Sequence, residues 1–320
     1  MLALIIRRFV YALPIAIGVT VVCFSLVHLA PGDPLNAVLG PDASAEVVET
    51  LKRAYGFDQP LPVQYAKWLH RAVSGDLGRS IATGRPVSSE MSHAIGNSIA
   101  LALVGATIGF SLGCLFGGLA GYAQGGFVDK IASFIAILGV SVPHYWLGMV
   151  MVILFAVELG ALPAIGIGPN GSAIWAWGRE DWGHAILPAV TLAVIPLGIV
   201  TRTVRASVAE ALNQEFVQAL RAKGLRPGAV LQHVMKNVAP VVLAVMGIQF
   251  GYLLGGSILV ETVFAWPGTG FLMNDAIFRR DIPVLQGVIL VLAMFFVGLN
   301  LAVDVLQTLI DPRIRRGAAR

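Results

Sequence analysis

Charge is what this sequence has least of. Of its 320 residues only 12% are Asp, Glu, Lys or Arg, whereas an average soluble domain has about 25%. Six stretches have no charged residue at all, and each approaches the ~20 residues that a helix needs to cross about 30 Å of hydrocarbon. They are 9–30, 98–123, 131–157, 185–201, 238–260 and 284–303. This scarcity excludes an ordinary water-soluble fold and predicts one all-α membrane domain, 1–320, with six transmembrane helices.

Motifs for catalysis and nucleotide binding are also missing. The chain has neither G-x-S-x-G nor H-E-x-x-H, so we do not expect an enzyme. It has no G-x-x-x-x-G-K-[ST] phosphate loop, so ATP would have to be bound by partner chains. Proton or ion coupling usually places acidic residues near mid-membrane, and the six stretches contain none. This disfavours an ion-coupled secondary transporter relative to a transporter driven by ATP-binding partner chains. A passive membrane scaffold or cofactor anchor is the other alternative.

The basic residues that remain are unevenly distributed. Among the short segments outside the predicted spans, one side of the membrane has 13 Lys and Arg and the other has three. The positive-inside rule makes the richer side cytoplasmic, and six spans then place both termini in the cytoplasm. The net charge of +4 is explained by this orientation, so we expect no nucleic-acid partner.

The segment 31–97 is the longest one outside the predicted spans. Its apolar residues recur at helical spacing in two runs, and Gly56 and Pro62 mark a helix end and a helix start. We therefore predict a small external helical insertion that lies against the membrane face, followed by the core helices in 98–303. The two apolar runs are Val47, Val48, Leu51, Ala54 and Tyr55, and Leu61, Tyr65, Trp68, Leu69 and Ala72.

Glycine recurs at every fourth residue in two of the predicted spans. Such a row makes one smooth helix face that a neighbouring backbone can approach closely, and close packing holds helices together in lipid. Static packing and sliding during a transport cycle are both compatible with this pattern. The helix-packing glycines are Gly105, Gly109, Gly113, Gly117 and Gly121 in the second span, and Gly247, Gly251 and Gly255 in the fifth.

Proline interrupts two predicted spans, at Pro143 in the third and at Pro188 and Pro196 in the fourth. A proline removes a backbone donor and bends the helix, and membranes tolerate this where the freed carbonyl finds a partner or lines a cavity. His144 follows Pro143 directly. A structural kink and a transport pathway lined by Pro143 and His144 both remain open.

The charged stretch 202–240 separates the fourth and fifth spans. A plain connector needs only a few residues, so this length suggests a docking surface. An apolar stripe predicts one helix, Gly224 ends it with a backbone of positive φ, and Pro227 opens a second helix that runs to Asn237. The stripe consists of Val208, Leu212, Phe216, Ala219 and Leu220.

The residues of this stretch resemble a known family. The run RASVAEALNQEFVQALRAKGL, followed by HVMKNVAP, is similar to the cytoplasmic coupling loop of ATP-binding-cassette (ABC) importer permeases. Further segments resemble the dipeptide and oligopeptide branch, in particular the subunit with a large external insertion after its first helix. In chain order these are LVHLAPGDP, YGFDQPLPVQYAKWL, SGDLGRS, SVPHYWLG, VETVFAWPGTG and LIDPRIR.

The resemblance implies a type I ABC importer permease fold in a bacterial inner membrane. It implies transport of di- or oligopeptides, although related members import nickel, glutathione or oligosaccharides. Its partners would be a second homologous permease, two ABC ATPases that bind ATP and Mg, an extracytoplasmic substrate-binding protein and membrane lipid. No cofactor or metal is expected on this chain itself. The residues expected to couple to the ATPases are Glu215, Phe216, Ala219, Arg221, Ala222, Lys223, Gly224 and Leu225.

Two aromatic residues follow the fifth predicted span. Phe264 and Trp266 lie in VETVFAWPGTG and would sit at the external membrane interface. They could anchor the chain there as part of an aromatic belt, or they could form a gate that contacts substrate. The sequence leaves both interpretations open.

Overall fold

The computed structural model describes residues 2–29, 49 and 58–310, and the described part is helical apart from its turns and an isolated bridge between Arg79 and Pro86. The helices are α1 (Leu2–Leu29), α4 (Leu61–Val73), α5 (Val87–Tyr122), α6 (Phe127–Ser141), α7 (His144–Met151), η1 (Val152–Glu158, a π-helix), η2 (Ile174–Ala176, a 3₁₀ helix), α8 (Arg179–Leu212), α9 (Glu215–Ala222), α10 (Pro227–Val263), α11 (Thr269–Arg279) and α12 (Ile282–Ile310).

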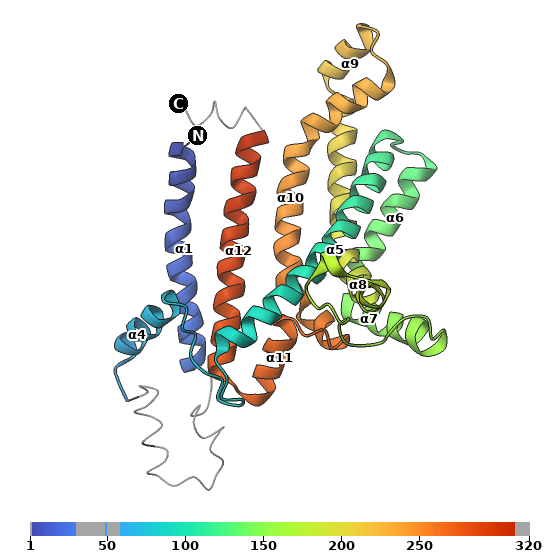
Figure 1. Ribbon diagram of the computed structural model, residues 1–320. Helices are drawn as coiled ribbons and strands as arrows, with labels where there is room; N and C mark the ends of the chain where they lie inside the picture. The colour runs from blue at the N-terminus through green and yellow to red at the C-terminus, as the bar shows by residue number, and fades with distance from the viewer. Residues whose placement is uncertain (1, 30–48, 50–57, 311–320) are drawn as a thin grey trace.

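The helices form a bundle with two distinct ends (Figure 1). Helices α1, α12 and α10 stand side by side, and α5 crosses the bundle obliquely toward α8 and α6. Helix α9 lies at one end, together with the start of α1 and the end of α12. Helices α4 and α11 lie at the opposite end. These are called the α9 end and the α11 end below.

Among the residues that the structure describes, four helices are long and apolar enough to cross a membrane: α5, α8, α10 and α12, the last over Ile282–Leu306. The pair α6 and α7–η1 counts as a fifth span if the two bent halves are taken together, and α1 contributes the shorter apolar helix Phe9–Ser25. The expected six spans therefore correspond to six apolar segments, but their number stays a prediction.

The glycine row of α5 packs directly on α8. A side chain added at Gly109, Gly117 or Gly121 would meet a backbone carbonyl of α8 at 2.8, 2.6 or 2.8 Å. Two prolines inside α8 do not interrupt this contact, because the helix is continuous through both and Pro196 lies against Gly109. Because these glycines have no side chain, the backbones of α5 and α8 can pack directly against each other.

The glycines of α10 behave less uniformly. Gly247 packs against Val303 and Gly251 against Phe296, both on α12. Gly255 has no described atom within 4 Å of the position its Cβ would occupy, so it makes no close helix contact within the described part of this chain and its role in packing stays a prediction. It lies on the side of α10 that this chain leaves uncovered.

The third predicted span, 131–157, is broken rather than continuous. Its two halves meet at an angle of 97° around Val142 and Pro143. Val142 is extended, with φ −83° and ψ 126°, because the ring of a following proline disfavours the helical region. The second half then ends in the π-helical turn η1. Pro143 was expected to bend the span, whereas in the structure it separates the span into two helices.

The external insertion ends earlier than predicted. Helix α5 begins at Val87, so 87–97 belong to a core helix rather than to the insertion 31–97. The second predicted apolar run is α4, which packs on α1 through a hydrogen bond of 2.8 Å between the hydroxyls of Thr20 and Tyr65. The first run, 47–55, lies outside the described residues except for Glu49.

Candidate functional site

The stretch 202–240 is built mainly from the ends of two long helices. The predicted single helix is divided, because α8 ends at Leu212, residues 213–214 turn, and α9 begins at Glu215. The helix that opens at Pro227 does not stop at Asn237 but continues as α10 to Val263. The predicted cytoplasmic loop is therefore α9 held between two extended helix ends, which makes it a rigid projection (Figure 1).

A buried apolar cluster fixes α9 to its two supports. Val217 of α9 is fully buried, and it packs in the cluster with Val208 of α8 and Val234 of α10. Phe216 and Leu225 lie partly buried against the same cluster. Because packed interiors transmit displacement with little compression, a push on α9 moves the ends of α8 and α10 with it.

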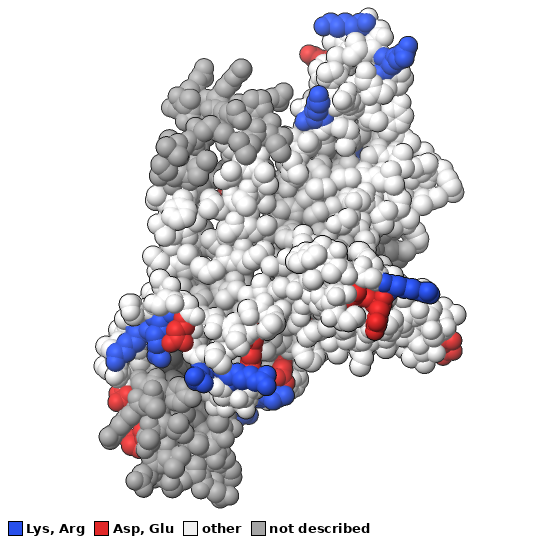
Figure 2. Space-filling view, viewed as in Figure 1, with Lys and Arg blue, Asp and Glu red and all other residues white. Residues whose placement is uncertain are grey.

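The outward face of α9 is small, polar and basic. Six of the predicted coupling residues are exposed, whereas Phe216 and Leu225 point inward. Figure 2 shows Lys and Arg side chains gathered over this end of the molecule. A positive surface of this kind suits a partner with acidic groups. The exposed residues are Glu215, Ala219, Arg221, Ala222, Lys223 and Gly224.

An ion pair ties a further helix to the support of α9. Arg205 of α8 donates through Nε and Nη2 to the two carboxylate oxygens of Asp129 on α6, the Nη2 bond being 2.8 Å long. The backbone N–H of Gly125 donates to the same carboxylate at 2.8 Å. This bidentate geometry, largely buried on the Asp129 side, joins the α5–α6 turn to the extended end of α8.

Gly224→Ala is expected to lower the stability of the α9 projection by about 1 kcal/mol, because an L side chain disfavours positive φ. Gly224 has φ +76° and open space around its Cβ position, so conformation alone is tested. The control is Gly228→Ala, also in open space but helical, which leaves stability unchanged or slightly raised. Thermal unfolding of both purified variants measures this difference, and equal shifts would contradict the role of Gly224.

At the α11 end, Glu261 forms the centre of a buried hydrogen-bond network. Its side chain is fully buried at the end of α10. Ser98 of α5 donates to its Oε1 at 2.6 Å, and the backbone N–H groups of Gly270 and Phe271 donate to its Oε2 at 2.6 and 3.2 Å. Among the described residues no cation pairs with it. The N-terminus of α11 therefore stabilises this carboxylate.

The same network fastens the segment that contains the two aromatic residues. Trp266 Nε1 donates to the carbonyl of Asn97 at 3.0 Å, and Asn97 Nδ2 donates back to the carbonyl of Pro267 at 2.9 Å. Thr269 N–H donates to Ser98 Oγ at 2.8 Å. The segment 264–270 is consequently locked onto α5.

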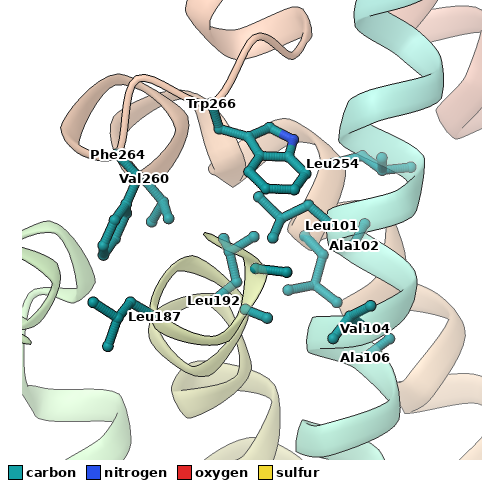
Figure 3. Packing of buried hydrophobic residues seen from close by; sticks show 13 residues of the cluster. Leu101, Ala102, Val104, Ala106, Leu187, Leu192, Leu254, Val260, Phe264 and Trp266 are labelled. Atoms are coloured by element: carbon teal, nitrogen blue, oxygen red, sulfur yellow. The ribbon is translucent and has the colours of Figure 1, made fainter. Parts of the chain in front are cut away.

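Phe264 and Trp266 are not at a membrane interface in this structure. Trp266 is fully buried and Phe264 is 2% exposed. Figure 3 shows the Trp266 ring directed toward Leu101 and Leu254, with Phe264 near Leu187. The belt interpretation is therefore wrong, whereas a role as a gate stays a prediction. The sequence pattern places aromatic residues after a span, but only folding turns the segment inward.

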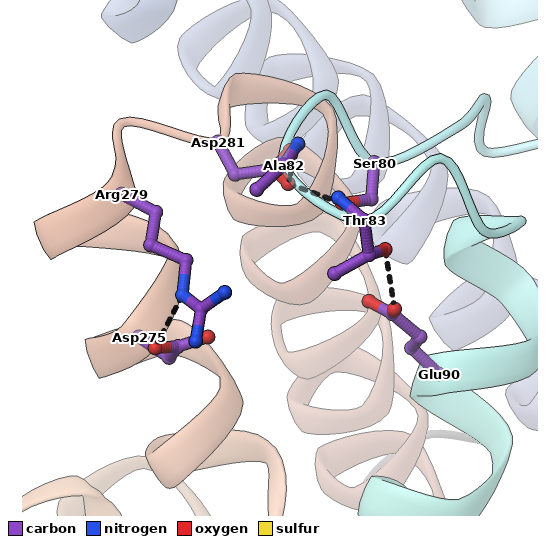
Figure 4. Close-up of polar contacts among 7 residues, drawn as sticks. All are labelled: Ser80, Ala82, Thr83, Glu90, Asp275, Arg279 and Asp281. Atoms are coloured by element: carbon purple, nitrogen blue, oxygen red, sulfur yellow. Dashed lines mark hydrogen bonds and ion pairs between the residues drawn. The ribbon is translucent and has the colours of Figure 1, made fainter. Parts of the chain in front are cut away.

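A second buried carboxylate lies at the corner between α11 and α12 (Figure 4). Asp281 accepts a hydrogen bond from the Ser80 hydroxyl and bonds of 3.2 and 3.1 Å from the N–H groups of Ile81 and Ala82. It also accepts the N–H of Val284 in the first turn of α12 at 3.4 Å. The loop around SGDLGRS is thereby pinned to the core. Sequence reasoning missed both Glu261 and Asp281, because each lies just outside an uncharged stretch.

The predicted pathway residues lie at the break between α6 and α7. His144 is half-buried, and no described residue offers a hydrogen-bond partner to its buried Nε2. Four residues further along α7, Gly148 packs against the ring of Phe264. The break therefore adjoins the locked segment. Within the described residues no cluster of three or more His, Cys, Asp or Glu could hold a metal ion.

These features define a multi-pass helical membrane protein of the transport class, with a rigid projection at one end. Residues 109–316 match the family described as "Binding-protein-dependent transport system inner membrane component". Residues 1–99 match "Binding-prot-dependent transport system membrane comp, N-term". The chain therefore belongs to the family of membrane components of binding-protein-dependent transport systems.

Relatives of known name agree with this family. The dipeptide transport system permease protein DppB of Alkalihalophilus pseudofirmus is 38% identical over 334 residues, which cover 98% of this chain and 100% of that protein. The glutathione transport system permease protein GsiC of Escherichia coli K12 is 37% identical over 316 residues, covering 98% of this chain and 99% of that protein. The resemblance to ABC importer permeases and the non-enzymatic transport role are confirmed.

A solved structure supports the fold alone. The inward-facing MetNI methionine ABC transporter matches with a TM-score of 0.56 at 19% identity, over 69% of this chain and 96% of that one. Together with the all-helical architecture this confirms the predicted importer-permease fold class, apart from the number of spans.

Proposed function

We propose that this chain forms half of the translocation path of an ATP-driven importer for di- or oligopeptides. A second homologous permease forms the other half, two ATPase chains bind ATP and Mg at the α9 end, and an extracytoplasmic binding protein delivers the substrate at the α11 end. The membrane is a bacterial inner membrane, and both termini lie in the cytoplasm.

The observation that carries the proposal is the mechanical design of α9. The inner face of α9, with Val217, packs against α8 and α10, while its outer face is exposed and is not part of the buried cluster. A helix held in this way suits the transfer of motion from a soluble motor to membrane helices. The Arg205 and Asp129 pair extends the same rigid unit to α6. The chain needs no catalytic residues for this role, because it supplies a path for the substrate and no covalent bond is made or broken.

The substrate class rests on the relatives. Their names include dipeptide and glutathione transport, and glutathione is itself a small peptide. A nickel or oligosaccharide importer of the same family is the alternative. ATP-dependent uptake of labelled dipeptide, tripeptide and glutathione by the reconstituted complex tests the class, with each unlabelled peptide as a competitor. If none of these peptides were taken up, peptides would be rejected as the substrate.

The second permease needs a surface on which to dock. Helix α10 leaves Ile248, Tyr252 and Leu259 exposed, with Gly255 in open space between them. An uncovered apolar face with a glycine lets a second helix approach closely, so we assign it to the contact between the two permeases and to the path.

Ala219→Arg is expected to reduce the amount of ATPase that co-purifies with this chain by about ten-fold or more, because overpacking a contact costs about 1–3 kcal/mol. Ala219 is exposed on α9 and is not part of the buried cluster, so the variant should fold normally. ATPase chains retained on the tagged, purified permease are quantified.

The matched control is Gln232→Arg, which adds the same side chain at an exposed position on α10 near the same end. It should retain the ATPases and ATP-dependent uptake. If both variants kept the ATPases, α9 would not be their docking site. If uptake continued without ATP and collapsed with an ion gradient, the chain would instead be an ion-coupled transporter.

A further inference from the structure

Helix α4 has an exposed cationic face that the transport proposal does not use. Lys67, His70 and Arg71 are all exposed, and because residues three and four apart are neighbours on a helix, they form one patch. No acidic residue occurs anywhere in α4. Among the described residues Lys67 and Arg71 make no ion pair. We call Lys67, His70 and Arg71 the α4 basic patch.

The opposite face of α4 is held by the outer end of α1. Tyr65 and Trp68 pack on Phe24, with ring centroids 5.5 and 5.9 Å from its ring. The hydroxyl of Thr20 reaches Tyr65 at 2.8 Å. Thr20 and Phe24 lie in the second half of α1 (Leu2–Leu29), so α4 crosses α1 toward the α11 end of the bundle.

The position of α4 in the bundle also favours lipid as its neighbour. Helix α1 lies at the margin of the molecule, and α4 projects beyond it (Figure 1). The surface of α1 is rich in exposed apolar side chains such as Phe9, Ile15 and Val22, which suit lipid tails. No residue of α4 is buried, and Val73 is 81% exposed. An apolar flank beside a basic face is the arrangement of helices that lie in a membrane interface.

We propose that the α4 basic patch binds the headgroups of anionic phospholipids in the outer leaflet. Lys67 and Arg71 would contact the phosphates, while Tyr65 and Trp68 fix the depth of the helix. The expected consequence is that lipid charge orients α4. The choice of the outer leaflet rests on the proposed orientation, with the α9 end in the cytoplasm, whereas the headgroup contact does not depend on the transported substrate.

The test uses the purified complex in a mild neutral detergent. Phosphatidylglycerol is titrated in, and its half-saturation concentration is read from the rise in thermal stability, with phosphatidylcholine as the neutral reference. Lys67→Gln combined with Arg71→Gln is expected to weaken the phosphatidylglycerol response about 25-fold, since each basic residue near an anionic surface contributes about a five-fold factor. Added salt should weaken the wild-type response in the same direction.

Two further double variants make the result specific. Arg85→Gln with Arg179→Gln removes two other exposed arginines outside α4 and should keep the wild-type half-saturation concentration. Lys67→Arg with Arg71→Lys keeps the charges and should also respond as wild type, which would show that the response depends on positive charge at these two positions. The proposal is overturned if the glutamine variant at Lys67 and Arg71 keeps its phosphatidylglycerol response, or if the Arg85 and Arg179 variant loses as much. It is also overturned if the glutamine variant loses only its affinity for the binding protein.

Discussion

Gly117→Val prevents this chain from reaching its native packing, whereas Gly118→Val leaves it intact. A Cβ at Gly117 would lie 2.6 Å from the carbonyl oxygen of Thr201 and 2.7 Å from the Cβ of Val204, both on α8. Backbone cannot move aside as a flexible side chain can, so α5 and α8 would have to separate. Overpacking costs about 1–3 kcal/mol even in adaptable cores, and a clash against backbone lies at or above the upper end.

The neighbouring residue is the matched control for this prediction. Gly118 has no atom within 4 Å of its Cβ position and belongs to the same helix. The insertion of valine into the apolar sequence is therefore the same in both variants, and only the contact with α8 differs. Monodisperse yield in detergent and the thermal midpoint are measured for both. If Gly117→Val matched Gly118→Val, the close packing of α5 on α8 would be refuted.

Glu261→Ala is expected to lower the free energy of unfolding by about 3 kcal/mol or more, because buried hydrogen-bond donors lose their acceptor. The substitution leaves Ser98 and the N–H groups of Gly270 and Phe271 without their acceptor. Each unsatisfied buried donor costs about 1–3 kcal/mol. The segment that contains Trp266 should then detach from α5 first, because the network holds it there.

Two further variants serve as comparisons for Glu261→Ala. Glu261→Gln keeps the size but offers one acceptor oxygen in place of two, so an intermediate loss is expected. Asp275→Ala removes the exposed pair with Arg279 on α11, and such surface pairs contribute only about 0–1 kcal/mol. Thermal unfolding gives the stability order, and the fluorescence of the tryptophans reports the exposure of Trp266. A loss from Asp275→Ala as large as that from Glu261→Ala would show that burial is not the cause.

The helical membrane class was predictable because it follows from local properties of the sequence, namely the length and the lack of charge of its apolar stretches. Uncharged stretches of sufficient length force helices in lipid, since each backbone polar group must be satisfied within its own segment. The glycine row of α5 likewise predicted a close helix contact, and α8 provides it. The same spacing in α10 gave no such contact at Gly255 within the described residues, because spacing shows that a face is smooth but not whether a neighbour from this chain covers it.

The candidate site was predictable only in part. The turn at Gly224 followed from its local sequence, and the structure has the expected positive φ. Phe264 and Trp266 were misplaced, because their burial depends on Asn97 and Ser98, which are more than 160 residues away in the chain. Glu261 was not recognised, since a charge at the edge of an apolar stretch is ordinarily solvated and nothing local shows that it is buried.

The sequence by itself determined that the chain lies in a membrane, that its helices pack through glycine, and that it has no phosphate loop for ATP. These properties come from composition, spacing and missing motifs. Only the tertiary structure decided that the third span breaks at Pro143, that α9 is anchored by Val217 between two long helices, and that Glu261 locks an aromatic segment inside the bundle. Burial and hydrogen-bond partners depend on which distant residues meet, and that is a property of the folded chain.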